Sequence, residues 1–129
     1  MNKRVLIIDD DEDLLRSFQV TLESQGFAVI TSESGINGLA LLRSEKPDLL
    51  VLDVMMKTNL EGYNLLHLIK KEPDFKKLPI IILTGMIDQL GVNLVSGVED
   101  EVLFPNVWFQ DKPVDPLFLA KMIEDILSS

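Results

Sequence analysis

The sequence contains no cysteine, no long apolar run and few basic residues, and each absence excludes a class of protein. Without cysteine, disulfide bonds, thiolate metal sites and a cysteine nucleophile are excluded, and a reducing compartment is permitted. No run approaches the roughly 18 apolar residues of a membrane span, and the apolar run before Asp9 is too short for a signal peptide. We therefore expect a cytoplasmic protein that does not enter a membrane.

The balance of charge is acidic, with 21 Asp and Glu residues against 12 Lys and Arg residues and a net charge of −9. Contacts to nucleic-acid phosphates need clustered basic side chains, so we expect no direct binding of nucleic acid. Hydrophobic residues make up 47% of the 129 residues, which is enough for a substantial core. We predict one domain that spans residues 1–129.

Short apolar runs without alternation indicate strands that are covered on both faces. Such runs occupy residues 3–8, 27–31, 49–52, 79–83 and 107–109. Segments of helical period follow them. The first ends at Gly26, the second begins at the cap Ser34 and is stopped by Pro47, a third covers 63–71, and the last begins at Asp115. Residues 85–106 lack a clear period, and we expect a helix plus an irregular loop there.

Strands that alternate with helices predict an α/β fold with a mostly parallel, doubly wound sheet and right-handed crossovers. In such sheets the ligand crevice lies at the carboxyl ends of the strands. The residues expected at those ends are Asp9, Asp10, Asp53, Thr84 and, after the fifth strand, Lys112. Three carboxylates, a hydroxyl and an ammonium should therefore meet at one edge of the sheet.

Five consecutive acidic residues, 9–13, raise the question of what compensates their mutual repulsion. We assign Asp11, Glu12 and Asp13 to the N-terminus of the following helix, where the helix dipole favours acids. Asp9 and Asp10 lie at the strand end, where the dipole does not explain them, and we predict that they bind a metal. An EF-hand is excluded because the sixth and twelfth residues counted from Asp9 are neither Gly nor Glu.

With these residues in this order, the sequence resembles the receiver domain of two-component response regulators. The resemblance is carried by four motifs in order: "IIDDDEDL", "LLVLDVMM", "IIILTG" and "QDKPV". It covers the whole chain and implies a flavodoxin-like five-stranded parallel sheet of strand order 2-1-3-4-5, with helices on both faces. It also implies a non-enzymatic switch that accepts a phosphoryl group from a histidine kinase or phosphotransfer protein.

The resemblance implies a role for each site residue. Asp53 is the expected phosphoacceptor. The expected Mg²⁺ ligands are Asp9, Asp10, Asp53 and the backbone carbonyl of Met55. Lys112, Thr84 and Gly85 are expected to bind the phosphoryl group, and Thr84 with Phe109 to act as the switch. Phosphorylation is then expected to change the surface of the fourth helix, fifth strand and fifth helix, with a homodimer as one outcome. In this family the Lys112–Pro113 bond is commonly cis.

Two regions depart from the family pattern. After Asp53, Lys57 stands at the usual Pro position, Glu61-Gly62 replaces Asp-Gly, and the loop is one residue longer than usual. The stretch from Thr84 to Lys112 is also longer than is common, so the identity of the output partner does not transfer from the family. The departure around Lys57 affects the loop that carries the Met55 carbonyl.

Three alternatives to a phosphorylated receiver need other residues or use these residues differently. A haloacid-dehalogenase-like phosphatase would need a second Asp where Met55 stands. A flavin or nucleotide binder would need a Gly-rich or hydroxyl-rich loop after the first strand, where acids would repel phosphate. A degenerate receiver that binds proteins without being phosphorylated stays open, because the unusual loop around Lys57 supports it.

Overall fold

The computed structural model describes residues 3–53, 61–84 and 106–128. The strands are β1 (Arg4–Ile8), β2 (Ala28–Ser32), β3 (Leu49–Asp53), β4 (Ile80–Thr84) and β5 (Val107–Asp111). The helices are α1 (Glu12–Ser24), α2 (Gly35–Glu45), α3 (Glu61–Lys71), the short 3-10 helix η1 (Pro73–Phe75) and α5 (Pro116–Ser128). Each strand lies within one or two residues of its predicted bounds.

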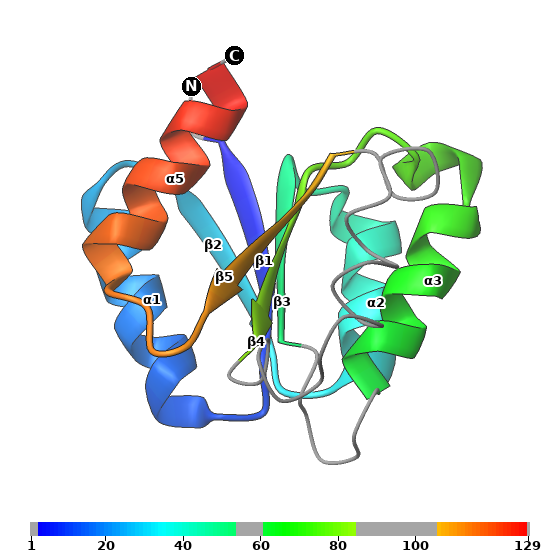
Figure 1. Ribbon diagram of the computed structural model, residues 1–129, viewed down its shortest axis with the longest axis horizontal. Coiled ribbons are helices and arrows are strands. Elements are labelled where there is room, and N and C mark those ends of the chain that lie inside the picture. The colour runs from blue at the N-terminus through cyan, green and yellow to red at the C-terminus, as the bar shows by residue number, and fades with distance from the viewer. Residues whose placement is uncertain (1–2, 54–60, 85–105, 129) are drawn as a thin grey trace.

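All neighbouring strands pair in parallel, in the order β2-β1-β3-β4-β5. Helices α1 and α5 cover one face of this sheet, and α2 and α3 cover the other (Figure 1). Both the doubly wound fold and the strand order are therefore confirmed. Because all strands run the same way, their carboxyl ends lie at one edge of the sheet.

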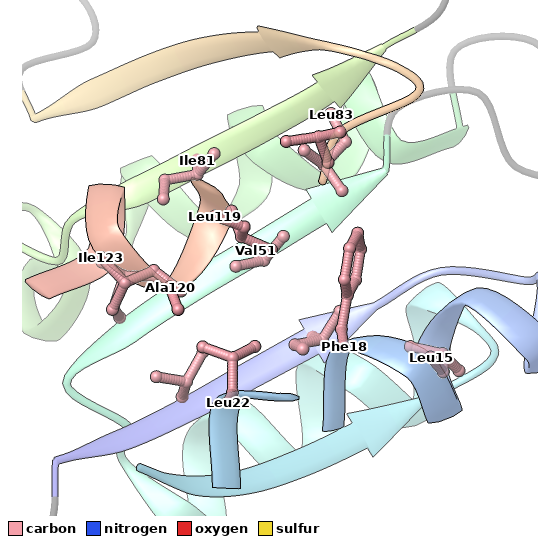
Figure 2. Packing of buried hydrophobic residues seen from close by; sticks show 13 residues of the cluster. Leu15, Phe18, Leu22, Val51, Ile81, Leu83, Leu119, Ala120 and Ile123 are labelled. Carbon is pink, nitrogen blue, oxygen red and sulfur yellow. The ribbon is translucent and has the colours of Figure 1, made fainter. Parts of the chain in front are cut away.

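Each face of the sheet has its own apolar core. Figure 2 shows the core under α1 and α5, where Phe18 and Leu22 of α1 and Leu119 and Ile123 of α5 pack on strand residues such as Val51. All five of these side chains are fully buried. Each contributes about 1.5–3 kcal/mol by leaving water. The opposite core contains Leu6, Ile8 and Ile82 among others, packed under α2 and α3.

Helix α2 approaches the sheet closely because of a glycine. A Cβ atom added to Gly38 would lie 2.4 Å from Cδ1 of Ile8, which is closer than real side chains come. The apolar stripe of α2 alone is short, with Leu42 as its one large, fully buried side chain. The close contact at Gly38 therefore helps to fix the position of α2 against β1.

The predicted helix ends are present in the structure. Asp11 caps α1 by accepting hydrogen bonds from the N–H groups of Asp13 and Leu14, each at 3.1 Å. The Ser34 hydroxyl accepts one from the N–H of Asn37, and the Asp115 carboxylate accepts one from the N–H of Leu117. Gly26, with a φ of +96°, follows the end of α1 in the left-handed region that glycine tolerates.

The structure also contains features that the sequence did not predict. Helix η1 is one, and the burial of Lys70 near the end of α3 is another. The predicted helix and loop over 85–106 lie outside the described residues, except for Asn106. Within the three described ranges, every helix is too short or too polar to cross a membrane.

Candidate functional site

Three carboxylates meet at the carboxyl ends of β1 and β3, as predicted. Asp53 is the last residue of β3, and Asp9 and Asp10 directly follow β1. The two strands are hydrogen-bonded neighbours, with Ile8 opposite Leu52, so their ends place these residues side by side. Each of the three offers a carboxylate oxygen, and these oxygens all lie within 4.8 Å of one another. Asp9 and Asp53 are buried, whereas Asp10 is partly exposed.

Lys112 completes this group and comes from the segment that directly follows the edge strand β5. Its backbone N–H donates a 2.8 Å hydrogen bond to the carbonyl of Thr84, which holds the residue against the end of β4. Its ammonium nitrogen lies 3.0 Å from Oδ2 of Asp9 and 3.3 Å from Oδ2 of Asp53. The Lys112–Pro113 peptide bond is cis, as the resemblance implied.

The electrostatics of the site reflect buried charge. Burial raises the pKa of Asp9 to about 6, and the nearby Asp53 charge acts in the same direction. A hydrogen bond from the Asp11 N–H and the ammonium of Lys112 oppose this rise. Burial also acts to lower the pKa of Lys112, but the carboxylates of Asp9 and Asp53 outweigh it and raise that pKa. The three carboxylates of the site therefore outnumber its one ammonium group, and the site carries excess negative charge.

The donor set fits a hard divalent cation. Oδ2 of Asp9 is fully buried, and the ammonium of Lys112 lies 3.0 Å from it. Three carboxylates this close repel one another, and one ammonium compensates them only in part, so a divalent cation would stabilise the cluster. Mg²⁺ prefers oxygen ligands and is commonly held by one or two carboxylates with water and phosphate oxygens. Asp9, Asp10 and Asp53 supply such oxygens.

Thr84 and Phe109 lie on neighbouring strands and on the same face of the sheet. Thr84 is the last residue of β4 and is fully buried. Phe109 stands opposite Ile82 in the β4–β5 pairing and packs against the core under α2 and α3. Since side chains two residues apart share a face of a strand, Thr84 lies diagonally from Phe109 on that face.

Two predicted site residues, Met55 and Gly85, lie outside the described residues, as does Lys57. One feature beside the site was not predicted. A cavity of about 340 Å³ opens next to Lys112, lined by Asp11, Leu14, Pro113 and Val114. Its apolar members could have been found from the sequence, because Leu14 is one helical turn beyond Asp11 and Val114 is two residues beyond Lys112.

Comparison with known proteins adds to this geometry. A family model described as the response regulator receiver domain matches residues 5–103. Among curated proteins, the chain is 39% identical over 103 residues to the transcriptional regulatory protein AfsQ1 of Streptomyces coelicolor, covering 78% of this chain and 44% of that protein. It is 32% identical over 129 residues to the alkaline phosphatase synthesis transcriptional regulatory protein PhoP of Bacillus subtilis, covering 98% and 49%. The chain thus spans about half the length of these relatives.

Solved structures give the same result. The structure matches a putative response regulator from Chloroflexus aurantiacus with a TM-score of 0.83 and 28% identity, over the full length of both chains. It matches a CheY-like response regulator receiver domain protein from Methanospirillum hungatei with a TM-score of 0.82 and 28% identity, over 99% of this chain and 95% of the other.

Proposed function

The chain belongs to the family of response regulator receiver domains, the phosphorylated modules of two-component signalling, and we propose that Asp53 is its phosphoacceptor. The observation that carries this proposal is the cluster of Asp9, Asp10 and Asp53 with the Lys112 ammonium within 3.0–3.3 Å of two of them. Receiver domains are generally non-enzymatic signalling modules, and we propose that this chain acts as one.

In the proposed reaction a carboxylate oxygen of Asp53 attacks phosphorus and forms an acyl phosphate. The new bond joins that oxygen to phosphorus, and the bond from phosphorus to the imidazole nitrogen of the donor histidine breaks. The leaving imidazole takes up a proton from solvent. Negative charge on the transferred group needs a fixed cation beside it, and Lys112, 3.3 Å from Oδ2 of Asp53, is positioned to provide one.

Asp9, Asp10, Asp53 and the carbonyl of Met55 are the proposed ligands of Mg²⁺. When bound, Mg²⁺ neutralises charge on the phosphoryl oxygens. The excess of carboxylates over ammonium groups in this buried cluster supports the assignment. The Asp11 N–H donates to Oδ1 of Asp9 at 3.0 Å and so keeps this carboxylate oriented while its other oxygen faces Lys112.

The proposed switch joins the site to a distant surface. Thr84 and Gly85 are proposed to bind the phosphoryl group, and the movement of Thr84 is proposed to change the space that Phe109 fills. Both lie on strands that pair directly, which supports a coupling between them. The surface that would respond includes β5 and α5, together with the fourth helix that the resemblance implies.

A histidine kinase or phosphotransfer protein is the proposed phosphoryl donor. The cavity of about 340 Å³ beside Lys112 supports an approach of this donor at the carboxyl edge of the sheet. Two relatives are named as transcriptional regulators, and control of transcription through a partner or a further domain is proposed for this chain. The net charge of −9 argues against direct contact between this chain and nucleic acid. A cytoplasmic location and a homodimer on phosphorylation belong to the same proposal.

The alternative, a degenerate receiver that binds proteins without phosphorylation, is not favoured. Its support was the unusual loop around Lys57. Against it stand the full set of acids and the lysine in one cluster, because a module that had lost phosphorylation would have no need for three apposed carboxylates.

Intact-mass measurement after incubation with acetyl phosphate tests the proposal. We expect a phosphoryl adduct that requires Mg²⁺ and that is absent from Asp53→Asn. Asp48→Asn is the matched control, since Asp48 is an exposed acid at the opposite end of β3. An adduct that persists in Asp53→Asn would show that Asp53 is not the acceptor, and one that forms equally without Mg²⁺ would contradict the proposed metal site.

A further inference from the structure

Strand β2 forms one edge of the sheet, and in the described part of the chain no strand lies beyond it. Residues 28–31 of this strand are all partly exposed, whereas every residue of the central strands β3 and β4 is buried. The Ala28 N–H donates a 2.8 Å hydrogen bond to the carbonyl of Lys3, so the backbone groups of Ala28 face β1. Successive residues of a strand direct these groups to opposite sides. Ile30 therefore also faces β1, and the N–H and C=O groups of Val29 and Thr31 point to the open edge.

The sequence of β2 does not protect this edge. Residues 26–32, "GFAVITS", contain neither a charged residue nor a proline. Charged side chains and proline are the usual means by which natural edge strands avoid pairing with another chain. Strand β5, at the opposite edge, ends in the exposed Asp111. Strand β2 is therefore suited to accept a further strand through its backbone hydrogen bonds.

We propose that two copies of this chain pair through β2 in antiparallel orientation, about a two-fold axis at Ile30. Val29 of each copy then lies opposite Thr31 of the other, and each such pair exchanges N–H···O=C hydrogen bonds in both directions. The two copies of Ile30 face each other, and Ala28 lies opposite Ser32, so every side-chain pair along the strand is apolar or uncharged. The edge is thus complementary to itself, as a two-fold interface requires.

The charges at the two ends of β2 favour the antiparallel orientation. Exposed acids begin α1 beside the carboxyl end, and they are Asp11, Glu12 and Asp13. Exposed charges of both signs balance at the amino end, and they are Lys3, Glu23, Lys46 and Asp48. Antiparallel pairing brings each acidic end to the balanced end of the other copy, whereas parallel pairing would bring two acidic ends together. This dimer goes beyond the proposed function, because β2 and β5 lie at opposite edges of the sheet and the pairing needs no phosphoryl group.

The chain has no cysteine, so a single introduced thiol tests both the pairing and its register. In the proposed dimer the two copies of Ile30 form a non-hydrogen-bonded antiparallel pair, with Cα atoms about 4.5 Å apart, which suits a disulfide. Under mild oxidation of the full chain with oxidised glutathione, Ile30→Cys should form a disulfide-linked dimer at least about tenfold faster than Ile36→Cys. Ile36 is the matched control, because it is 85% exposed on α2 and random collisions would favour its thiol.

The chain without a thiol gives a second measurement. Analytical ultracentrifugation up to about 1 mM protein should show a dimer for the wild type and for Asp53→Asn alike. Amide hydrogen exchange of Val29 and Thr31 should slow at least about tenfold in this dimer. Thr31→Pro removes an N–H at the open edge and no bond to β1, so it should stay monomeric, whereas Thr31→Val keeps the donor and should dimerise.

Three results would each overturn the proposed pairing. They are a wild type that stays monomeric over the whole concentration range, equal rates of cross-linking for Ile30→Cys and Ile36→Cys, and a dimer whose Val29 and Thr31 amides exchange as fast as in the monomer. The acetyl phosphate adduct is measured separately. Its absence alongside cross-linking of Ile30→Cys would count against the proposed function and leave the β2 dimer standing.

Discussion

Two lysines of this chain are largely withdrawn from water, and their surroundings move their pKa values in opposite directions. Lys112 lies among carboxylates at the carboxyl end of the sheet, and they raise its pKa against the effect of burial. Lys70 lies near the end of α3, and burial lowers its pKa to about 8. The Lys70 ammonium donates to the backbone carbonyls of Phe75, Lys76 and Leu78 at 3.4, 3.3 and 2.8 Å.

Burial acts to lower the pKa of both lysines, and the partners decide the outcome. Carbonyl dipoles satisfy the three N–H donors of Lys70 without supplying a full negative charge, so the ammonium is tethered and its desolvation is only partly offset. Its contacts join α3 to η1 and to the residues before β4, which is a structural role. Lys112 faces two acids that a phosphoryl group and a cation would also contact. A buried lysine therefore indicates a reaction site only when its partners are charged and meet at a strand end.

The largest effect that separates the two lysines should be on phosphorylation. Lys112→Met keeps most of the side-chain volume and removes the charge beside Asp53. We expect Mg²⁺-dependent phosphorylation by acetyl phosphate to slow by about 100-fold, the usual result of removing one preorganised electrostatic contact. Lys70→Met should phosphorylate at the wild-type rate. The rates follow from the growth of the phosphoryl adduct by intact mass. Equal rates for Lys112→Met and the wild type would show that the Lys112 charge does not contribute to phosphorylation.

The second effect should be on stability. Lys70→Met leaves the carbonyls of Phe75, Lys76 and Leu78 without their donor, and we expect a loss of about 2–3 kcal/mol in the free energy of unfolding. Lys71→Met is the matched control. It changes an exposed lysine in the same helix, and its effect should stay within about 0.5 kcal/mol. Urea unfolding measures both. A loss in Lys70→Met no greater than in Lys71→Met would mean that the three hydrogen bonds contribute little.

These two positions also show what the sequence can predict. Lys112 was found because Asp9, Asp53, Thr84 and Lys112 all follow apolar strands, and parallel strands bring their ends together. Lys70 looked like any polar residue near a helix end. Its burial depends on how the chain turns back through η1 to β4, and a turn of this kind has no periodic signal in the sequence.

The same distinction holds for the fold. The strands were predicted to within one or two residues, since continuous apolar runs are typical of a sheet covered on both faces. Helix caps such as Ser34 and Asp115 were predicted because their side-chain chemistry is local. The exposure of Leu117 and Phe118 was not predicted, because helical period indicates an apolar stripe but not which of its edges the sheet covers. The predictions for Met55 and Gly85 stay untested.

A third effect should be a dependence of stability on pH that comes from Lys70. The pKa of Lys70 is about 8 in the folded chain and 10.5 for a lysine in water, so between these pH values the unfolded chain holds more protons. The free energy of unfolding should therefore rise as pH increases from about 8 to 10.5. We expect a rise of about 3 kcal/mol, because each unit of difference between the two pKa values is worth about 1.4 kcal/mol. Unfolding curves of the wild type, with Lys70→Met subtracted, measure it. A flat or falling difference would contradict the assignment.

The smallest effect should be on the affinity for Mg²⁺, and it concerns the competition between two cations for the same acids. The Lys112 ammonium lies 3.0 Å from Oδ2 of Asp9 and 3.3 Å from Oδ2 of Asp53, so a bound Mg²⁺ must share these carboxylates with it. Removing the ammonium in Lys112→Met removes a like charge from the neighbourhood of the metal. Because the Lys112 side chain is partly exposed and its charge is screened by water, we expect this to be worth about 1 kcal/mol, so the affinity should increase about fivefold. Asp10→Ala should abolish binding, and Lys70→Met should leave it unchanged. Midpoints of thermal unfolding over a Mg²⁺ series report all four proteins, because a ligand that binds only the folded state raises the midpoint by mass action. A weaker affinity in Lys112→Met would mean that the lysine orients the carboxylates for the metal more than it competes with it, and the two lysines would then share a structural role.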